Sequence, residues 1–212
     1  MFADRQEAGR MLATRLRAYR GARPIVLGLP RGGVVVAREV ADALDAPLDV
    51  VVARKIGAPG YAELAIGAVT ASGTRVLHDE ALRRLFIPPG YLEDATEHAR
   101  KEAQRRERVL RGDRPPPALA GRTAILVDDG IATGMTMLAA IQDVRAAGPA
   151  RLVVAAPVGA PDTLELIERE ADELVVLAAP PGFRAVGEYY YAFDQTEDAE
   201  VQALLATPGR RS

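Results

Sequence analysis

The sequence lacks several residue types on which common enzyme mechanisms depend. Its 212 residues include no cysteine, no tryptophan and no asparagine, and its only histidines are His78 and His98. Without cysteine there is no thiol nucleophile, no disulfide and no thiolate zinc site. Two histidines so far apart in sequence provide neither an HExxH pair nor a multi-histidine metal cage. Any chemistry must therefore use carboxylates, hydroxyl groups, backbone amides, arginine or a hard metal ion.

Serine, lysine and long apolar runs are also scarce. Serine occurs only at Ser72 and Ser212, and Ser72 is not in the GxSxG turn of a serine hydrolase. Lys55 and Lys101 are the only lysines among 27 basic residues, and the formal net charge of -2 does not favour nucleic-acid binding. No run approaches the roughly 18 to 20 apolar residues of a membrane span, so we expect a cytoplasmic protein without a membrane segment.

The hydrophobic pattern predicts an α/β fold, with a doubly wound parallel sheet of about five strands flanked by helices. Apolar runs rich in Val, Ile and Leu alternate with helical patterns, as expected for strands that are buried on both faces. The candidate strands are residues 24–29, 48–53, 64–70, 74–77, 123–129, 151–158 and 173–179. We expect one domain over residues 1–212, with a core at about 22–180, a helical insertion at about 78–118 and a C-terminal appendage at about 180–207.

The most distinctive strand end is ILVDDGIATGMTM, residues 125–137. Asp128 and Asp129 end an apolar run, and a loop of glycine and threonine then leads into a helix. Unpaired amides at a helix N-terminus form an anion site, and glycine lets a phosphate approach the backbone closely. The paired carboxylates would accept hydrogen bonds from a vicinal diol. The segment therefore predicts a site for a ribose 5-phosphate, and the alternative is a helix cap followed by an ordinary turn.

This segment resembles the 5-phosphoribosyl-1-diphosphate (PRPP) binding motif of type I phosphoribosyltransferases. The resemblance implies that Asp128 and Asp129 are catalytic, hold the ribose 2- and 3-hydroxyls, and hold a Mg²⁺ ion through ribose or water. It also implies that the following loop cradles the 5-phosphate through Gly130, Ile131, Ala132, Thr133, Gly134, Met135 and Thr136.

Two further segments resemble diphosphate-binding elements of the same family. Arg31, Gly32 and Gly33 lie in GLPRGGV (28–34), which is similar to the pyrophosphate loop, and the alternative is a glycine-rich turn between a strand and a helix. Arg54 and Lys55 resemble an Arg-Lys pair directed at pyrophosphate, and the alternative is a solvated strand end. A strand order of 3-2-1-4-5 would make the strands before the two phosphate loops neighbours.

Residues 56–67 stand where the family has its mobile catalytic loop, and the resemblance makes Glu63 a candidate general base; the alternative is an exposed loop acid. Residues 181–198 resemble the base-binding hood, so the C-terminal appendage would bind the acceptor through Phe183, Tyr189 and Tyr190. These aromatic residues could instead pin the C-terminal segment onto the sheet. The basic helix at 97–111 is typical of a solvated, ion-paired helix, with a subunit or RNA contact as alternatives.

The resemblance as a whole implies a Mg²⁺-dependent homodimer that transfers the 5-phosphoribosyl group from PRPP to a nitrogen of a nucleobase-like acceptor and releases diphosphate. The expected partners are PRPP and this small-molecule acceptor. A non-catalytic or regulatory protein of the same fold that binds PRPP or a nucleotide is the alternative. An enzyme that hydrolyses PRPP or handles ribose phosphates is another.

Overall fold

A computed structural model describes residues 1–207, apart from the side chains of residues 62 and 63, so the end of the expected domain at 208–212 lies outside the described residues. Its centre is a five-stranded parallel sheet with the order β2-β1-β6-β7-β8. The strands are β1 (Ile25–Gly28), β2 (Leu48–Val50), β6 (Thr123–Val127), β7 (Arg151–Val158) and β8 (Glu173–Ala178). The predicted fold class, a parallel sheet of about five strands flanked by helices, is confirmed.

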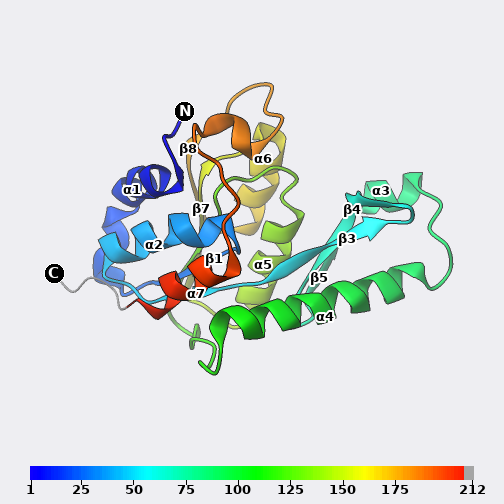
Figure 1. Ribbon diagram of the computed structural model, residues 1–212, viewed down its shortest axis with the longest axis horizontal. Helices are drawn as coiled ribbons and strands as arrows, with labels where there is room; N and C mark the ends of the chain where they lie inside the picture. The colour runs from blue at the N-terminus through cyan, green and yellow to red at the C-terminus, as the bar shows by residue number, and fades with distance from the viewer. Residues whose placement is uncertain (208–212) are drawn as a thin grey trace.

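Helices cover both faces of this sheet (Figure 1). On one face lie α1 (Arg5–Arg15) and α2 (Gly32–Leu44), and on the other lie α5 (Met135–Ala146) and α6 (Pro161–Glu170). Successive strand residues point to opposite faces, so Val26 packs with α1 and α2 while Leu27 packs with α5 and α6. This two-sided burial explains why the strands read as continuous apolar runs.

The strand order differs from the expected 3-2-1-4-5. Numbered along the chain within the sheet, the order is 2-1-3-4-5, because the expected third strand at 64–70 belongs to a separate antiparallel sheet. The adjacency that matters for the phosphate loops is nevertheless present. Gly28, the last residue of β1, pairs with Val127, the last residue of β6. The segments that follow these two residues therefore leave the sheet side by side.

The antiparallel sheet and two helices form a projection from the core (Figure 1), which we call the arm and define as residues 53–111. It contains β3 (Ala53–Ala58), β4 (Tyr61–Thr70), β5 (Arg75–Leu77), α3 (Asp79–Arg84) and α4 (Tyr91–Arg111). One face of its sheet packs on α5 through Ala68, and the other packs on α4 through Ile56 and Ile66. The predicted helical insertion with a break near Pro88 is thus present, although it follows a sheet.

Two boundaries predicted for the arm are wrong. The strand expected at 48–53 ends at Val50, and Ala53 already begins β3, so Arg54 and Lys55 lie within a strand rather than at its end. The mobile loop expected at 56–67 is a β-hairpin that turns at Gly60, where φ is +73°. The two strands of this hairpin form because each buries alternate residues between α4 and α5, which a pattern in one segment does not reveal.

The C-terminal segment returns over the site and adds elements that the sequence did not predict. They are the short 3₁₀ helix η2 (Val186–Tyr189) and the helix α7 (Asp198–Ala206), while η1 (Arg17–Ala22) follows α1 near the N-terminus. The N-terminal residues pair with this segment, because Phe2 N donates to the Tyr189 carbonyl at 2.8 Å and Tyr191 N donates to the Phe2 carbonyl at 2.9 Å. Within residues 1–207, no helix has the length and apolar character needed to cross a membrane.

Candidate functional site

The loops after β1 and β6 meet in a very close contact. A Cβ atom on Gly32 would lie 1.9 Å from Asp129 Oδ2, and one on Gly33 would lie 2.8 Å from Asp128 Oδ1. Only residues without a side chain fit here, so the two consecutive glycines are what allows the loops to approach. Arg31, Gly32 and both aspartates line a cavity of about 410 Å³. The predicted neighbourhood of the two loops is therefore observed.

The loop from Gly130 to Gly134 is held rigidly from behind. Ile131 N donates to the Val158 carbonyl, the Ala160 amide donates to the Ile131 carbonyl, both at 2.9 Å, and Thr163 Oγ1 donates to the Ala132 carbonyl at 2.7 Å. Among the described residues, the amides of positions 132–134 donate to no protein acceptor. These amides precede the N-terminus of α5, where the helix dipole favours an anion. The geometry suits a phosphate group.

Asp129 is linked to both ends of the chain. Its Oδ2 accepts from Arg5 Nε at 2.7 Å, and its carbonyl accepts from the Tyr190 hydroxyl at 2.6 Å. Arg5 also donates to the Asp194 carbonyl at 2.7 Å and lies over the Phe193 ring, 3.9 Å from its centroid. Arg5 is a site residue that sequence reasoning missed, because nothing in a helix with several arginines distinguishes this one.

Asp128 has a different environment from its neighbour. Its Oδ1 accepts the amide of Asp129 at 2.8 Å, and no described cation forms an ion pair with it. Desolvation of the carboxylate, followed by the charge of Asp129, raises the pKa of Asp128 well above its usual range. Desolvation and the charge of Asp129 also raise the pKa of Tyr190, which keeps its hydroxyl as a donor. Burial and the neighbouring carboxylate therefore favour the neutral form of Asp128 in the unliganded chain.

The predicted Arg-Lys pair lines a second cavity of about 880 Å³ between β3 and α4. Arg54, Lys55 and Thr136 are among its lining residues, so the cavity extends to the beginning of α5, directly after the phosphate loop. The structure thus brings the predicted pair to the phosphate loop, but in a different cavity from the two aspartates. Glu63 belongs to β4, and its side chain lies outside what the structure describes, so its role stays a prediction.

The aromatic residues of the predicted hood differ in their distance from the cavity of the two aspartates. Phe183 and Tyr189 stack on each other with ring centroids 5.5 Å apart, and Tyr190 is buried against Phe2. None of the three predicted acceptor residues lines the cavity of the two aspartates, whereas Phe193 does. Tyr190 therefore pins the hood to the site, in line with the alternative weighed for these residues. Acceptor binding by Phe183, Tyr189 and Tyr190 stays a prediction.

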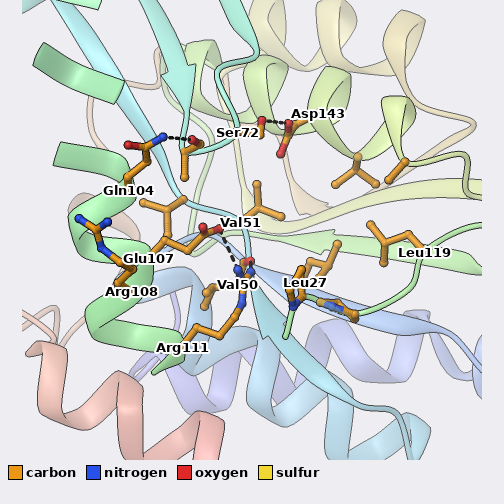
Figure 2. Close-up of a pocket in the computed structure, with 16 residues that line it drawn as sticks. Leu27, Val50, Val51, Ser72, Gln104, Glu107, Arg108, Arg111, Leu119 and Asp143 are labelled. Atoms are coloured by element: carbon orange, nitrogen blue, oxygen red, sulfur yellow. Dashed lines mark hydrogen bonds and ion pairs between the residues drawn. The ribbon is translucent and has the colours of Figure 1, made fainter. Parts of the chain in front are cut away.

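A third cavity, of about 640 Å³, lies between β2, α4 and the end of α5 (Figure 2). It contains none of the predicted site residues. Figure 2 shows Glu107 and Arg111 pointing toward each other across its edge, and Arg111 also donates to Asp49 Oδ1 at 3.1 Å and to the Val50 carbonyl at 2.9 Å. These contacts fix α4 onto β2, and with it the side of the arm that faces the site.

Comparison with known proteins gives consistent matches. The family model described as the phosphoribosyl transferase domain matches residues 3–180. A Mycobacterium tuberculosis H37Rv protein provisionally named a phosphoribosyl transferase is 49% identical over 207 residues, which are 97% of this chain and 46% of that protein. The chain thus spans about half the length of the curated relatives that it matches.

Two solved structures support the architecture. The TT1426 protein from Thermus thermophilus is 47% identical and superposes with a TM-score of 0.81, covering 96% of this chain and 97% of that one. The AQ2163 protein from Aquifex aeolicus is 13% identical with a TM-score of 0.52, covering 96% of this chain and 85% of that one. At this low identity, the second match shows the fold alone.

Proposed function

Because the chain belongs to the phosphoribosyl transferase domain family, we propose that it transfers the 5-phosphoribosyl group of PRPP to a nitrogen of a nucleobase-like acceptor and releases diphosphate. The supporting observation is the contact of Asp128 and Asp129 with the glycine loop after β1, beside the unpaired amides of the loop before α5. A diol and a phosphate on one sugar match these two groups of donors and acceptors. The homodimer and the cytoplasmic location stay predictions.

The proposed reaction is a displacement at C1 of the ribose. The acceptor nitrogen forms a bond to C1 while the bond from C1 to the diphosphate oxygen breaks, and the electron pair leaves with diphosphate. The loop amides hold the 5-phosphate and the aspartates hold the hydroxyls, which fixes C1 relative to the positive side chains at Arg31 and Arg54. Rate enhancement then comes from positioning and from stabilisation of the leaving charge, without a covalent enzyme intermediate.

The donor set fits a magnesium ion that is held mainly by the substrate. Within the described residues, no group of three or more His, Cys, Asp or Glu side chains converges in a metal cage. Mg²⁺ in phosphate sites typically keeps several waters and uses one or two carboxylates together with phosphate oxygens. Asp128 and Asp129 would hold the ion through ribose or water, and the bound ion would stabilise the charge on the diphosphate.

A second candidate function is a regulatory protein that binds PRPP without turnover. The Arg5–Asp129 ion pair favours it, because this contact occupies one oxygen of the carboxylate that a ribose hydroxyl would use. Transfer would require the sugar to bind the remaining oxygens or to displace Arg5. In a protein that only senses PRPP, competition between Arg5 and the ribose for Asp129 could serve as the signal, since ligand binding would release the N-terminal segment.

A screen for diphosphate release tests the proposed function. PRPP, Mg²⁺ and a panel of nucleobases are incubated with the chain, and base-dependent diphosphate release is expected. The double variant Asp128→Asn/Asp129→Asn should bind PRPP at least about 100-fold more weakly by calorimetry, because both carboxyl groups that would hold the diol are replaced by amides. Its far-UV circular dichroism spectrum should match that of the natural chain, which shows that the variant is folded. Binding without release for any base would support the regulatory candidate, and unchanged affinity in the double variant would overturn both.

A further inference from the structure

Charged residues from four segments surround one buried apolar cluster. The cluster includes one residue from α2, one from the link between β2 and β3, one from α4 and one from α7: Val34, Val52, Ala103 and Val201. Each of them has a charged residue two or three positions away, and these are Arg31, Arg54, Arg106 and Asp198, which we call the charged cluster. The four segments meet at the apolar cluster, and Arg106 interacts electrostatically with the other three charged residues.

The packing of α4 on α7 places Arg106 beside Asp198. Gln202 Nε2 donates to the Val109 carbonyl at 2.6 Å, and Arg114 donates to the Leu205 carbonyl at 2.8 Å, so both helices advance in the same direction along the contact. One helical turn before Gln202 and Val109 are Asp198 and Arg106. Arg106 also lies on the inward-facing side of α4, three residues after the buried Ala103.

The charges in this cluster are poorly balanced. Arg31 Nη1 is 3.9 Å from Asp198 Oδ1, which is too long for a hydrogen bond. Asp198 Oδ1 is nevertheless buried and accepts no hydrogen bond from any described residue. Arg106 has no hydrogen bond or ion pair in residues 1–207. Glu102, which pairs with Arg105, also lies near Arg54, so these surroundings hold more guanidinium groups than carboxylates. Buried polar groups are normally paired, so the unpaired oxygen of Asp198 beside this excess of arginine indicates a place that takes a multivalent anion.

Among the described residues that line the two cavities of the predicted site, Arg106 is absent, but it lies near one arginine from each cavity. Desolvation lowers the pKa of Arg106, the charge of Asp198 raises it, and the charges of Arg54 and Arg31 lower it further. Arg106 is therefore close enough to interact electrostatically with all three residues. Arg31 lines the cavity of the two aspartates, and Arg54 lines the cavity that reaches Thr136. The charged cluster therefore adjoins both the ribose side and the phosphate-loop side of the site.

We propose that Arg106 of α4 binds the diphosphate group together with Arg31 and Arg54, and that Asp198 is a built-in counterion which the diphosphate displaces. The identity of the anion rests on the proposed function. A diphosphate suits the cluster because guanidinium groups bind phosphate oxygens in pairs, and three of them approach from different elements. Asp198 lies in the first turn of α7 with its side chain 36% exposed, so it can turn toward solvent when the anion binds.

Calorimetry with inorganic diphosphate and, separately, with ribose 5-phosphate tests this proposal on the full chain. Arg106→Gln should weaken diphosphate binding at least about tenfold, because a charge-assisted contact is lost, and should leave ribose 5-phosphate binding unchanged. The matched control is Arg108→Gln, on the same helix but at an exposed position lining the third cavity (Figure 2), which should change neither affinity. Unchanged diphosphate binding in Arg106→Gln, or equal losses for both ligands, would overturn the proposal.

Asp198→Asn gives a test of opposite sign. Removal of the competing carboxylate should strengthen diphosphate binding by at least about threefold, a gain that loss of a merely structural contact does not produce. Weaker binding in Asp198→Asn would overturn the counterion role. Failure of the proposed function looks different, because no base would then cause diphosphate release from PRPP, while inorganic diphosphate would still bind in an Arg106-dependent way.

Discussion

The parallel core and the arm would contribute different chemical groups to the proposed site, and each lines its own cavity. The core would contribute backbone amides and carboxyl groups. The glycines after β1 contact the aspartates after β6, and a loop with unpaired amides precedes α5. The arm would contribute long cationic side chains: Arg54 and Lys55 of β3, which line the second cavity, and Arg106 of α4. Where two backbone segments are in close contact, an added side-chain atom has almost no room. A long cationic side chain can instead change its conformation. In the proposed site, the core would therefore set the position of the ligand, and the arm would add positive charge to that of Arg31.

The ion pairs of the two regions show the same contrast. The Arg5–Asp129 pair of the core is 2.7 Å long, and its side chains are only 12% and 15% exposed. The Arg84–Glu80 pair near the tip of the arm is 2.6 Å long, with side chains that are 77% and 55% exposed. The two pairs are nearly equal in length, but the core pair should stabilise the fold more. Water screens the charges of the exposed pair, whereas the core pair is largely shielded from water.

The largest expected effect is that of Gly32→Ala in the core. The new Cβ would lie 1.9 Å from Asp129 Oδ2 and 2.5 Å from Arg5 Nε, so the β1 loop and the aspartate must separate. PRPP affinity should fall at least about 100-fold by calorimetry, since the positions of both phosphate loops change. The matched control is Gly21→Ala, where a Cβ meets nothing within 4 Å. A Gly32→Ala chain that binds PRPP normally would show that the core is as adjustable as the arm.

Much of the core could be predicted from the sequence because its signals are local. A strand that is buried on both faces is apolar along its whole length, and Asp128 to Thr136 form one continuous motif. The adjacency of β1 and β6 followed from the rule for doubly wound sheets. Arg5 could not be predicted, since its role depends on an N-terminal segment that pairs with residues far away in sequence.

The arm was predicted less well because its structure depends on two distant helices. The strand predicted at 64–70 is the second half of β4, but the rest of the hairpin contains glycine, proline and charged residues, which are typical of a loop. It is stable as a sheet because α5 covers one face and α4 covers the other. In the same way, Arg106 was grouped with a solvated helix, and only the packing of α7 shows that this part of α4 faces inward.

A smaller effect is expected for removal of the core ion pair. Arg5→Gln leaves Asp129 shielded from water and next to Asp128 without its cation, so the free energy of unfolding should fall by about 2 kcal/mol. Arg84→Gln in the arm should change it by less than about 0.5 kcal/mol. Urea unfolding measures both. If Arg5→Gln/Asp129→Asn recovers most of the loss, the effect is electrostatic; equal losses in Arg5→Gln and Arg84→Gln would erase the contrast between the two regions.

The smallest expected effect is a gain in stability when Asp128 is replaced. Its pKa is raised in the folded chain, so between its unfolded and folded pKa values the native state binds more protons, and stability falls as pH rises through this window. An asparagine side chain does not titrate, so Asp128→Asn should be more stable than the natural chain by at least about 1 kcal/mol at pH 8, with the gain shrinking toward pH 4. Urea unfolding of both chains at several pH values measures the difference in the free energy of unfolding. The other titrating groups are the same in both chains, so their contributions cancel in this difference. A variant that is less stable at pH 8 would mean that Asp128, like Asp129, has a cation partner, and the asymmetry between the two carboxyl groups would be lost.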